Sequence, residues 1–133
     1  TMNRRGACTA LVSGGFRQFT KKVKDHLGFS FEFGNRLGLR NGMFTGRVLG
    51  NLVTKSVKRQ ILLRLMSQLN LTPSDVLAVG DGANDLPMLK AAGMGVAYRA
   101  KPRVIKETQF RIDHVGLDGL LFFQGLLREE FVA

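Results

Sequence analysis

Cysteine and histidine are scarce in this sequence of 133 residues, which contains one cysteine and two histidines. Cys8 has no partner for an internal disulfide, and His26 and His114 lie far apart along the chain. A zinc site built from thiolates and imidazoles needs several such ligands close together, so we expect none here. Because the sequence shows no disulfide framework, a reducing cytoplasm is the expected compartment.

Long apolar runs are also missing. A membrane-spanning helix needs about 18 or more consecutive apolar residues, whereas the longest clusters, such as residues 120–123, are short. We therefore expect no membrane segment and no membrane partner. Hydrophobic residues make up 44% of the chain and charged residues 23%, which is typical of globular proteins. The length suits one domain, so residues 1–133 are predicted to belong to a single domain.

Acidic residues are rare in the first part of the chain. Residues 1–60 hold 12 lysines and arginines against only Asp25 and Glu32, while residues 61–133 hold eight basic and eight acidic residues. The net charge of +10 therefore arises entirely before residue 61. Such an excess is typical of a nucleic-acid surface, of a site for an anionic substrate, or of a chain whose acidic complement lies elsewhere. A solvated basic face would explain the charge equally well.

The spacing of apolar residues and glycines predicts alternating strands and helices. A helix end is expected at residues 1–7 and a hairpin or meander around residues 31–49, where Asn41 and Gly42 supply turn chemistry. The remaining predictions are strands at 8–12, 76–79, 94–98 and 110–112, and helices at 16–27, 55–69, 85–92 and 117–127. This alternation favours an α/β fold with a mostly parallel sheet, in which ligands bind beyond the carboxyl ends of the strands.

Two of these strand ends lead into polar, glycine-rich turns, Ser13-Gly14-Gly15 and the stretch 80–85. Backbone N–H groups at such turns can bind a phosphate, although the first turn could equally be ordinary punctuation. The second turn contains Asp81, Asn84 and Asp85, more oxygen ligands than a helix cap requires. Oxygen-only ligands suit Mg²⁺, and the two carboxylates need a cation or a lysine nearby to offset their repulsion.

Together, these stretches resemble two motifs of a known family. Residues 9–16 look like the second motif, and residues 80–88 like the fourth motif, of the haloacid dehalogenase superfamily and, within it, of the phosphoserine phosphatase family. Residues 33–37 and 42–46 are similar to the family's hairpin, and residues 100–102 to the segment after the fourth-motif strand. The resemblance covers about residues 6–127. It implies a Rossmann-like α/β core with a small β-hairpin, and Mg²⁺-dependent hydrolysis of a small phosphomonoester such as phosphoserine through an aspartyl-phosphate, as in serine biosynthesis.

The resemblance also implies roles for individual residues. The family's third motif is a lysine that neutralises the phosphoryl group, and Lys58 precedes Asp81 by 23 residues, a spacing similar to the family's. Lys55, on the same side of the predicted helix, is the competing candidate. By motif, Asp81 would bind Mg²⁺, and Asp85 would orient Lys58 or a metal-bound water as the second catalytic residue. The residues expected to hold phosphoryl oxygens are Lys58, Ser13, Gly14 and Asn84.

One departure from the family pattern changes what is expected of the chain. The first motif, Asp-x-Asp-x-Thr, supplies the nucleophile and the general acid, and no two of the six aspartates in this sequence are two positions apart. The helical cap that the family inserts between its first and second motifs is also absent. We therefore expect the chain to correspond to the C-terminal portion of a phosphatase and to be nearly inactive alone. Its expected partners are the missing N-terminal segment or another chain.

The charge distribution also fits a function of another class. A basic nucleic-acid-binding module would use the charge of residues 1–60, with Phe29, Phe31 and Phe33 as stacking surfaces. Aromatic residues make up only 8% of the chain and tryptophan is absent, so we do not favour a nucleic-acid partner. A non-catalytic pseudophosphatase fragment is a further alternative. The phosphorylation domain of an ion pump is a third alternative, but Ser13-Gly14-Gly15 matches the second motif of that family poorly.

Overall fold

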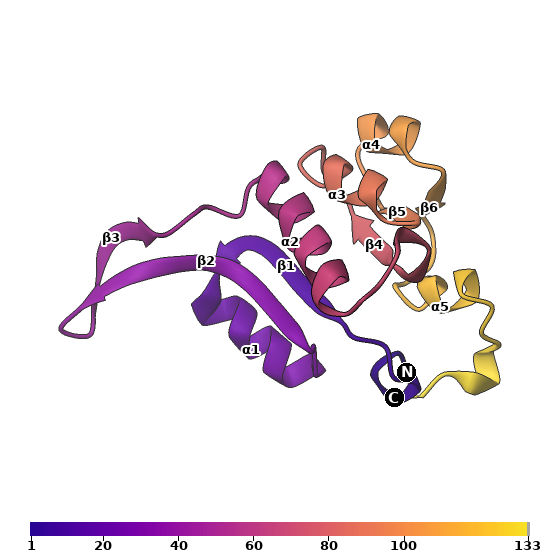
Figure 1. Ribbon diagram of the computed structural model, residues 1–133, viewed down its shortest axis with the longest axis horizontal. Helices are drawn as coiled ribbons and strands as arrows, with labels where there is room; N and C mark the ends of the chain where they lie inside the picture. The colour runs from indigo at the N-terminus through magenta and orange to yellow at the C-terminus, as the bar shows by residue number, and fades with distance from the viewer. Residues whose placement is uncertain (133) are drawn as a thin grey trace. The chain divides into compact units, whose positions relative to one another are not determined.

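The computed structural model describes residues 1–132, which divide into two compact units (Figure 1). The N-terminal unit comprises residues 1–54 together with Val132, and the C-terminal unit comprises residues 55–131. Each unit contains one three-stranded sheet. Within the described residues, no helix is both long enough and apolar enough to span a membrane.

The N-terminal unit is built around a parallel strand pair. A 3-10 turn, η1 (Asn3–Arg5), ends at Gly6 with a left-handed φ of 83°, which agrees with the predicted helix end. The elements that follow are β1 (Ala10–Phe16), α1 (Arg17–Leu27), β2 (Phe31–Arg40) and β3 (Met43–Leu49). β1 pairs in parallel with β2, and β2 pairs antiparallel with β3. The unit therefore has the strand, helix, strand order that the sequence predicts.

The predicted hairpin is confirmed, with ten residues in β2 and seven in β3. Asn41 and Gly42 both have positive φ, 52° and 77°, as the favoured two-residue hairpin turn requires. Every residue of β3 is exposed. Phe29, Phe31 and Phe33 are half-buried rather than presented as open rings, so they offer little surface on which bases could stack.

One boundary in this unit differs from the prediction. The strand expected to stop at residue 12 continues through Ser13, Gly14 and Gly15 to Phe16. The ladder is irregular there, because Val12 is opposite Phe33 and Phe16 is opposite Asn35. β1 therefore uses two more residues than β2 over this stretch, and the glycines form a bulge within the strand instead of a turn that ends it.

The C-terminal unit alternates strands and helices around a parallel sheet with the order β4-β5-β6. Its elements are α2 (Lys55–Gln68), η2 (Pro73–Asp75), β4 (Leu77–Gly80), α3 (Leu86–Ala91), β5 (Met94–Tyr98), α4 (Pro102–Glu107), β6 (Phe110–Ile112), α5 (Gly119–Phe123) and η3 (Arg128–Glu130). The predicted α/β class with mostly parallel strands is confirmed. The last predicted helix is much shorter than residues 117–127: α5 covers only Gly119–Phe123, and the chain turns soon afterwards at Gly125 with a φ of 77°.

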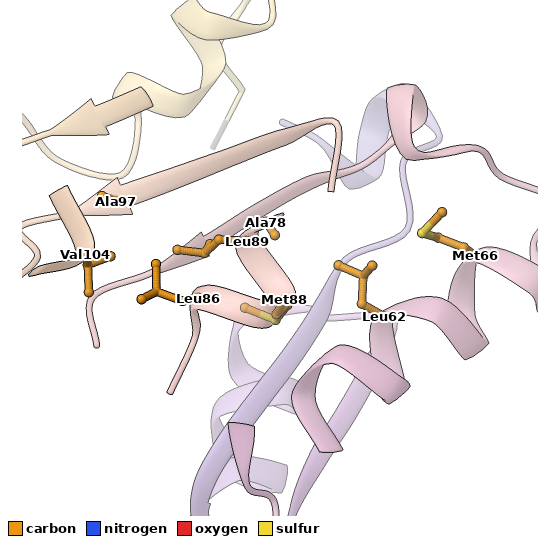
Figure 2. Packing of buried hydrophobic residues seen from close by; sticks show 8 residues of the cluster. All are labelled: Leu62, Met66, Ala78, Leu86, Met88, Leu89, Ala97 and Val104. Atoms are coloured by element: carbon orange, nitrogen blue, oxygen red, sulfur yellow. The ribbon is translucent and has the colours of Figure 1, made fainter. Parts of the chain in front are cut away.

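The hydrophobic core of the C-terminal unit holds α3 against the strands. Buried side chains come from α2, α3, α4, β4 and β5, and Figure 2 shows eight of them: Leu62, Met66, Ala78, Leu86, Met88, Leu89, Ala97 and Val104. Fully burying a large aliphatic side chain contributes about 1.5–3 kcal/mol. This packing fixes the segment between β4 and α3, which carries the acidic turn predicted to be functional.

Candidate active site

The centre of the acidic turn is a buried ion pair. Lys58 on α2 places its Nζ 2.6 Å from Oδ1 of Asp85, which directly precedes α3, and the two side chains are 9% and 6% exposed. Lys55, the competing lysine, is exposed. Of the two lysines considered, Lys58 is thus the one whose ammonium group contacts the acidic turn.

The second carboxylate oxygen of Asp85 is bound by the backbone. Oδ2 accepts hydrogen bonds from the N–H groups of Asp81 and Gly82, each at 3.1 Å. Burying a carboxylate is costly unless it is paired and hydrogen-bonded. Because Lys58 and the two amides bind both oxygens, Asp85 is held in one orientation and closes the turn between β4 and α3.

Gly80, the last residue of β4, makes this closure possible. A Cβ atom at position 80 would lie 2.5 Å from Cβ and 2.7 Å from Cγ of Asp85. Such contacts are far shorter than real Cβ atoms allow, and neither Asp85 atom is the free end of a flexible side chain. A glycine is therefore required at position 80 for Asp85 to pack against the strand end.

Asp81 and Asn84, the other oxygen donors of the turn, are exposed. Asp81 accepts a backbone hydrogen bond from Lys101 at 3.1 Å. It also borders a hollow of about 260 Å³ whose other lining residues are Val79, Gly80, Tyr98 and Arg99. The free edge of this turn thus offers an exposed carboxylate and an exposed amide at the carboxyl end of the parallel strands.

In the acidic turn of the C-terminal unit, one carboxylate is available to bind a magnesium ion. Asp81 is an exposed oxygen donor, whereas Asp85 is occupied by Lys58 and two amides. Among the residues that the structure describes, no three acidic, histidine or cysteine side chains cluster as a ready-made metal site. Mg²⁺ commonly binds through one or two carboxylates and keeps several waters, so Asp81 fits the role of a single protein ligand.

Ser13 and Gly14 lie in the bulge of β1, within the N-terminal unit. The Oγ of Ser13 accepts a hydrogen bond from the N–H of Gly15 at 2.9 Å. The carbonyl of Gly14 accepts one from the side chain of Asn35 at 2.8 Å. The bulge is thus fixed by side chains as well as by its flanking ladder.

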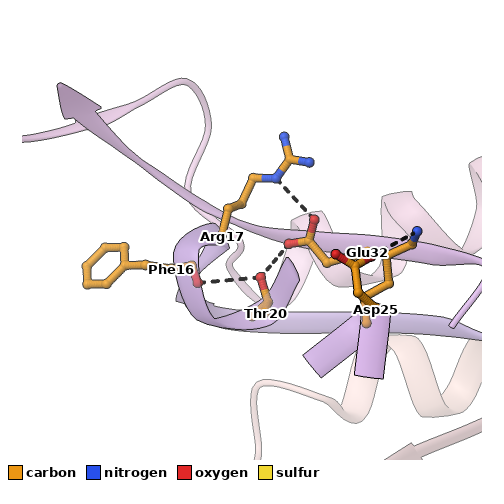
Figure 3. A network of polar contacts seen from close by, with 6 residues as sticks. Phe16, Arg17, Thr20, Asp25 and Glu32 are labelled. Atoms are coloured by element: carbon orange, nitrogen blue, oxygen red, sulfur yellow. Dashed lines mark hydrogen bonds and ion pairs between the residues drawn. The ribbon is translucent and has the colours of Figure 1, made fainter. Parts of the chain in front are cut away.

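Sequence reasoning missed two polar groups that support this bulge. Asn35 is buried, and its hydrogen-bond partners lie 21 and 18 residues away along the chain, so the sequence offered no local signal for it. Glu32 is the other: its side chain is only 2% exposed and receives hydrogen bonds from Thr20 and, at 3.1 Å, from Arg17 (Figure 3). A Cβ at Gly34 would come within 2.6 Å of Thr20 Oγ1 and 2.9 Å of Glu32 Oε1, so this contact also depends on a glycine.

Comparison with known proteins agrees with the motifs. Phosphoserine phosphatase from Streptomyces coelicolor is 41% identical over 133 residues, which is all of this chain and 32% of that protein. The unliganded crystal structure of a probable phosphoserine phosphatase from Vibrio cholerae matches with a TM-score of 0.86 and 41% identity over 90% of this chain and 37% of its own. A structure described as a phospho-aspartyl intermediate analogue of phosphoserine phosphatase matches with a TM-score of 0.83 and 36% identity, covering 92% of this chain and 58% of its own.

The chain therefore spans less than two thirds of the length of each of these proteins. The family model for haloacid dehalogenase-like hydrolases matches residues 1–93, well over half of the sequence. The match includes the bulge of β1, Lys58 and the whole acidic turn after β4. The chain thus belongs to the haloacid dehalogenase-like hydrolases and is similar in sequence and fold to phosphoserine phosphatases.

Proposed function

We propose that this chain provides the phosphoryl-binding and charge-neutralising part of a phosphoserine phosphatase that acts on phosphoserine or a closely similar phosphomonoester. The observation that carries the proposal is the buried contact between Lys58 and Asp85, together with the two backbone N–H groups that hold Asp85. A buried lysine fixed by a carboxylate beside a strand end is a preorganised cation for an anionic substrate. The relatives named as phosphoserine phosphatases support the choice of substrate.

The roles of the residues follow from their chemistry. Lys58 offsets the negative charge of the transferring phosphoryl group, and Asp85 positions its ammonium group. Asn84 and the Ser13-Gly14 bulge donate hydrogen bonds to phosphoryl oxygens. Asp81 would hold Mg²⁺, which supplies further positive charge at the phosphoryl oxygens when bound. With Asp81 as the only carboxylate ligand offered by the turn, we expect weak Mg²⁺ binding by the 133-residue chain, which titration calorimetry can measure.

The covalent part of the reaction belongs to residues that this sequence does not contain. In the proposed mechanism, an aspartate attacks phosphorus, the bond to the serine oxygen breaks, and water then hydrolyses the aspartyl-phosphate. The 133 residues include no Asp-x-Asp pair. We propose that residues 1–133 form part of one haloacid dehalogenase-like core domain, and that the nucleophile comes from a further segment or from another chain. A cytoplasmic location and a role in serine biosynthesis belong to the same proposal.

The test is phosphate release from phosphoserine in the presence of Mg²⁺. The 133-residue chain alone should give no turnover above background, and a fusion that adds an Asp-x-Asp strand and a cap ahead of Thr1 should regain activity. In that fusion, Lys58→Met should abolish turnover, while the matched exposed variant Lys55→Met should leave it unchanged. Substantial hydrolysis by the chain alone would make one of its six aspartates the nucleophile and overturn the mechanism. Full activity of the Lys58→Met fusion would show that Lys58 has no role in the mechanism.

A further inference from the structure

We propose that Asn35 is a positioning residue that orients the hydroxyl of Ser13 toward a phosphoryl oxygen, acting through the single peptide group between Gly14 and Gly15. The inference rests on the proposed function, because it assumes that the bulge of β1 binds phosphate. It adds to that site a residue of the hairpin stretch 33–37, to which the family resemblance assigned no role. All of the residues involved lie within the N-terminal unit.

The bulge gives β1 residues that have no regular partner in β2. Between Val12 and Phe16, β1 has two residues more than the matching stretch of β2, from Phe33 to Asn35. Extra residues in a bulge are left without regular ladder partners, so their orientation has to be set in another way. Gly14 and Gly15 are exposed and, as glycines, have the least intrinsic preference for one conformation. Left alone, this peptide would be poorly oriented for binding.

Asn35 supplies the missing constraint. Its Nδ2 donates to the carbonyl of Gly14 at 2.8 Å, and its Oδ1 accepts from the N–H of Val53 at 2.8 Å. Only the amide nitrogen can donate and only the amide oxygen can accept, so the two partners fix which way the group points. Asn35 is 8% exposed. A buried amide with both ends bound is a rigid connection between Val53 and the bulge.

The peptide plane carries this constraint to Ser13. The carbonyl of Gly14 and the N–H of Gly15 belong to one planar trans peptide, so they point in opposite directions. Asn35 binds the carbonyl, and the N–H at the other side donates to Ser13 Oγ at 2.9 Å. That bond occupies a lone pair of the hydroxyl oxygen. The Ser13 proton is then free to be donated to an anion instead of being used within the turn.

The decisive variant is Asn35→Asp, which keeps the size of the side chain and the acceptor for Val53 but loses the donor to Gly14. The probe is inorganic phosphate, titrated into the 133-residue chain while the backbone amide signals of Gly14 and Gly15 are followed by NMR. At neutral pH, Asn35→Asp should bind phosphate roughly tenfold more weakly than wild type. As the pH is lowered and the new carboxyl takes up a proton, its O–H can replace the lost donor. The ratio of the variant's affinity to the wild-type affinity should then return toward one.

Two comparisons separate this role from a general effect of charge or folding. Asn41→Asp makes the same charge change in the exposed hairpin turn and should leave phosphate affinity nearly unchanged. Asn35→Ala should bind weakly at every pH, with no recovery in acid. In a Ser13→Ala background, Asn35→Asp should cause little further loss, because there is no hydroxyl left to orient.

The outcomes distinguish the inference from the proposed function. If wild type shows no phosphate-dependent shift at Gly14 and Gly15, the bulge is not the phosphate site, and both proposals fail. If wild type binds and Asn35→Asp binds equally well, the positioning role is wrong while the phosphate site stands. Should the Asn35 variants not fold, Ser13→Ala with Ser30→Ala as its exposed control still decides. Unchanged phosphate affinity in Ser13→Ala would leave Asn35 without a hydroxyl to position and would overturn the inference.

Discussion

The two units differ in what they bury. Among the described residues, the N-terminal unit buries polar groups: Thr20 and Asn35 are buried, and the side chain of Glu32 is only 2% exposed. The C-terminal unit buries mainly aliphatic side chains, with Leu89 at 2% and Val96 and Val104 at 0% exposure, and it buries the Lys58–Asp85 ion pair beside them. The first unit is thus organised mainly by directional hydrogen bonds, and the second mainly by apolar packing around one buried ion pair. The contrast shows that two units of one chain can be stabilised in different ways, one mainly by hydrogen bonds and the other mainly by burial of apolar side chains.

The two units also differ in their balance of basic and acidic residues. Residues 1–54 carry nine lysines and arginines against two acidic residues, and residues 55–131 carry eleven against eight. The N-terminal unit holds the Ser13-Gly14 bulge in the more basic part of the sequence, and a basic setting favours anions. The C-terminal unit holds the acidic turn and its lysine. If the units differ as described, substitutions in each unit should lower stability for different physical reasons.

The largest expected effect is the loss of the buried ion pair in the C-terminal unit. Lys58→Met should lower the free energy of unfolding by about 3–5 kcal/mol, because it leaves the Asp85 carboxylate buried without its counter-charge. Lys55→Met, on the same helix but exposed, should change it by less than about 0.5 kcal/mol. Urea denaturation of both variants provides the measurement. Equal stability of the two would mean that the pair is not buried as described.

The next effect compares apolar side chains across the units. Leu89→Ala in the core of the C-terminal unit should cost about 2–5 kcal/mol. Phe19→Ala removes a larger side chain from the N-terminal unit, yet Phe19 is 70% exposed, so it should cost less than about 1 kcal/mol. Thermal and urea unfolding of the two variants test this directly. A larger loss for Phe19→Ala than for Leu89→Ala would reverse the comparison.

A smaller effect is expected where the N-terminal unit depends on polar contacts. Thr20→Val removes the hydroxyl that donates to the buried Glu32 carboxylate while keeping the shape of the side chain. Leaving that oxygen unsatisfied should cost about 1–3 kcal/mol. Hydrogen exchange of the β1 and β2 amides would show whether the loss is local to this unit. Slower exchange in the variant than in wild type would contradict the role given to the network.

The smallest effect concerns acid. The side chain and backbone N–H of Thr72 donate to Asp75 and hold the pKa of its carboxyl below the usual value. A group with a lowered folded-state pKa contributes stability that is lost as the pH falls through that pKa. Thr72→Val should therefore raise the pKa of Asp75 and weaken the acid dependence of stability. An NMR titration of the Asp75 carboxyl carbon checks it, and an unchanged pKa would mean that the hydroxyl contributes little.

Some elements of the structure could be predicted from the sequence, and others could not. The parallel strands and the acidic turn were predictable because apolar runs end at polar, glycine-rich segments. The helix α4 (Pro102–Glu107) was missed because its aliphatic residues, Val104 and Ile105, are adjacent and show no helical periodicity. The extension of β1 to Phe16 was missed because glycines favour turns locally, whereas a bulge is decided by pairing with β2. The role of Asn35 depends on partners 21 and 18 residues away, which no local pattern reveals.

The backbone bonds to Asp85 have a consequence for amide hydrogen exchange. Asp81 and Gly82 lie outside helix and strand, where amides usually exchange quickly with solvent. Their N–H groups are instead donated to the buried carboxylate of Asp85, and exchange requires those bonds to open. We therefore expect both amides to exchange nearly as slowly as those of β4. In Lys58→Met, exchange of both amides should become faster together, because the two amides and Lys58 all bind the carboxylate of Asp85.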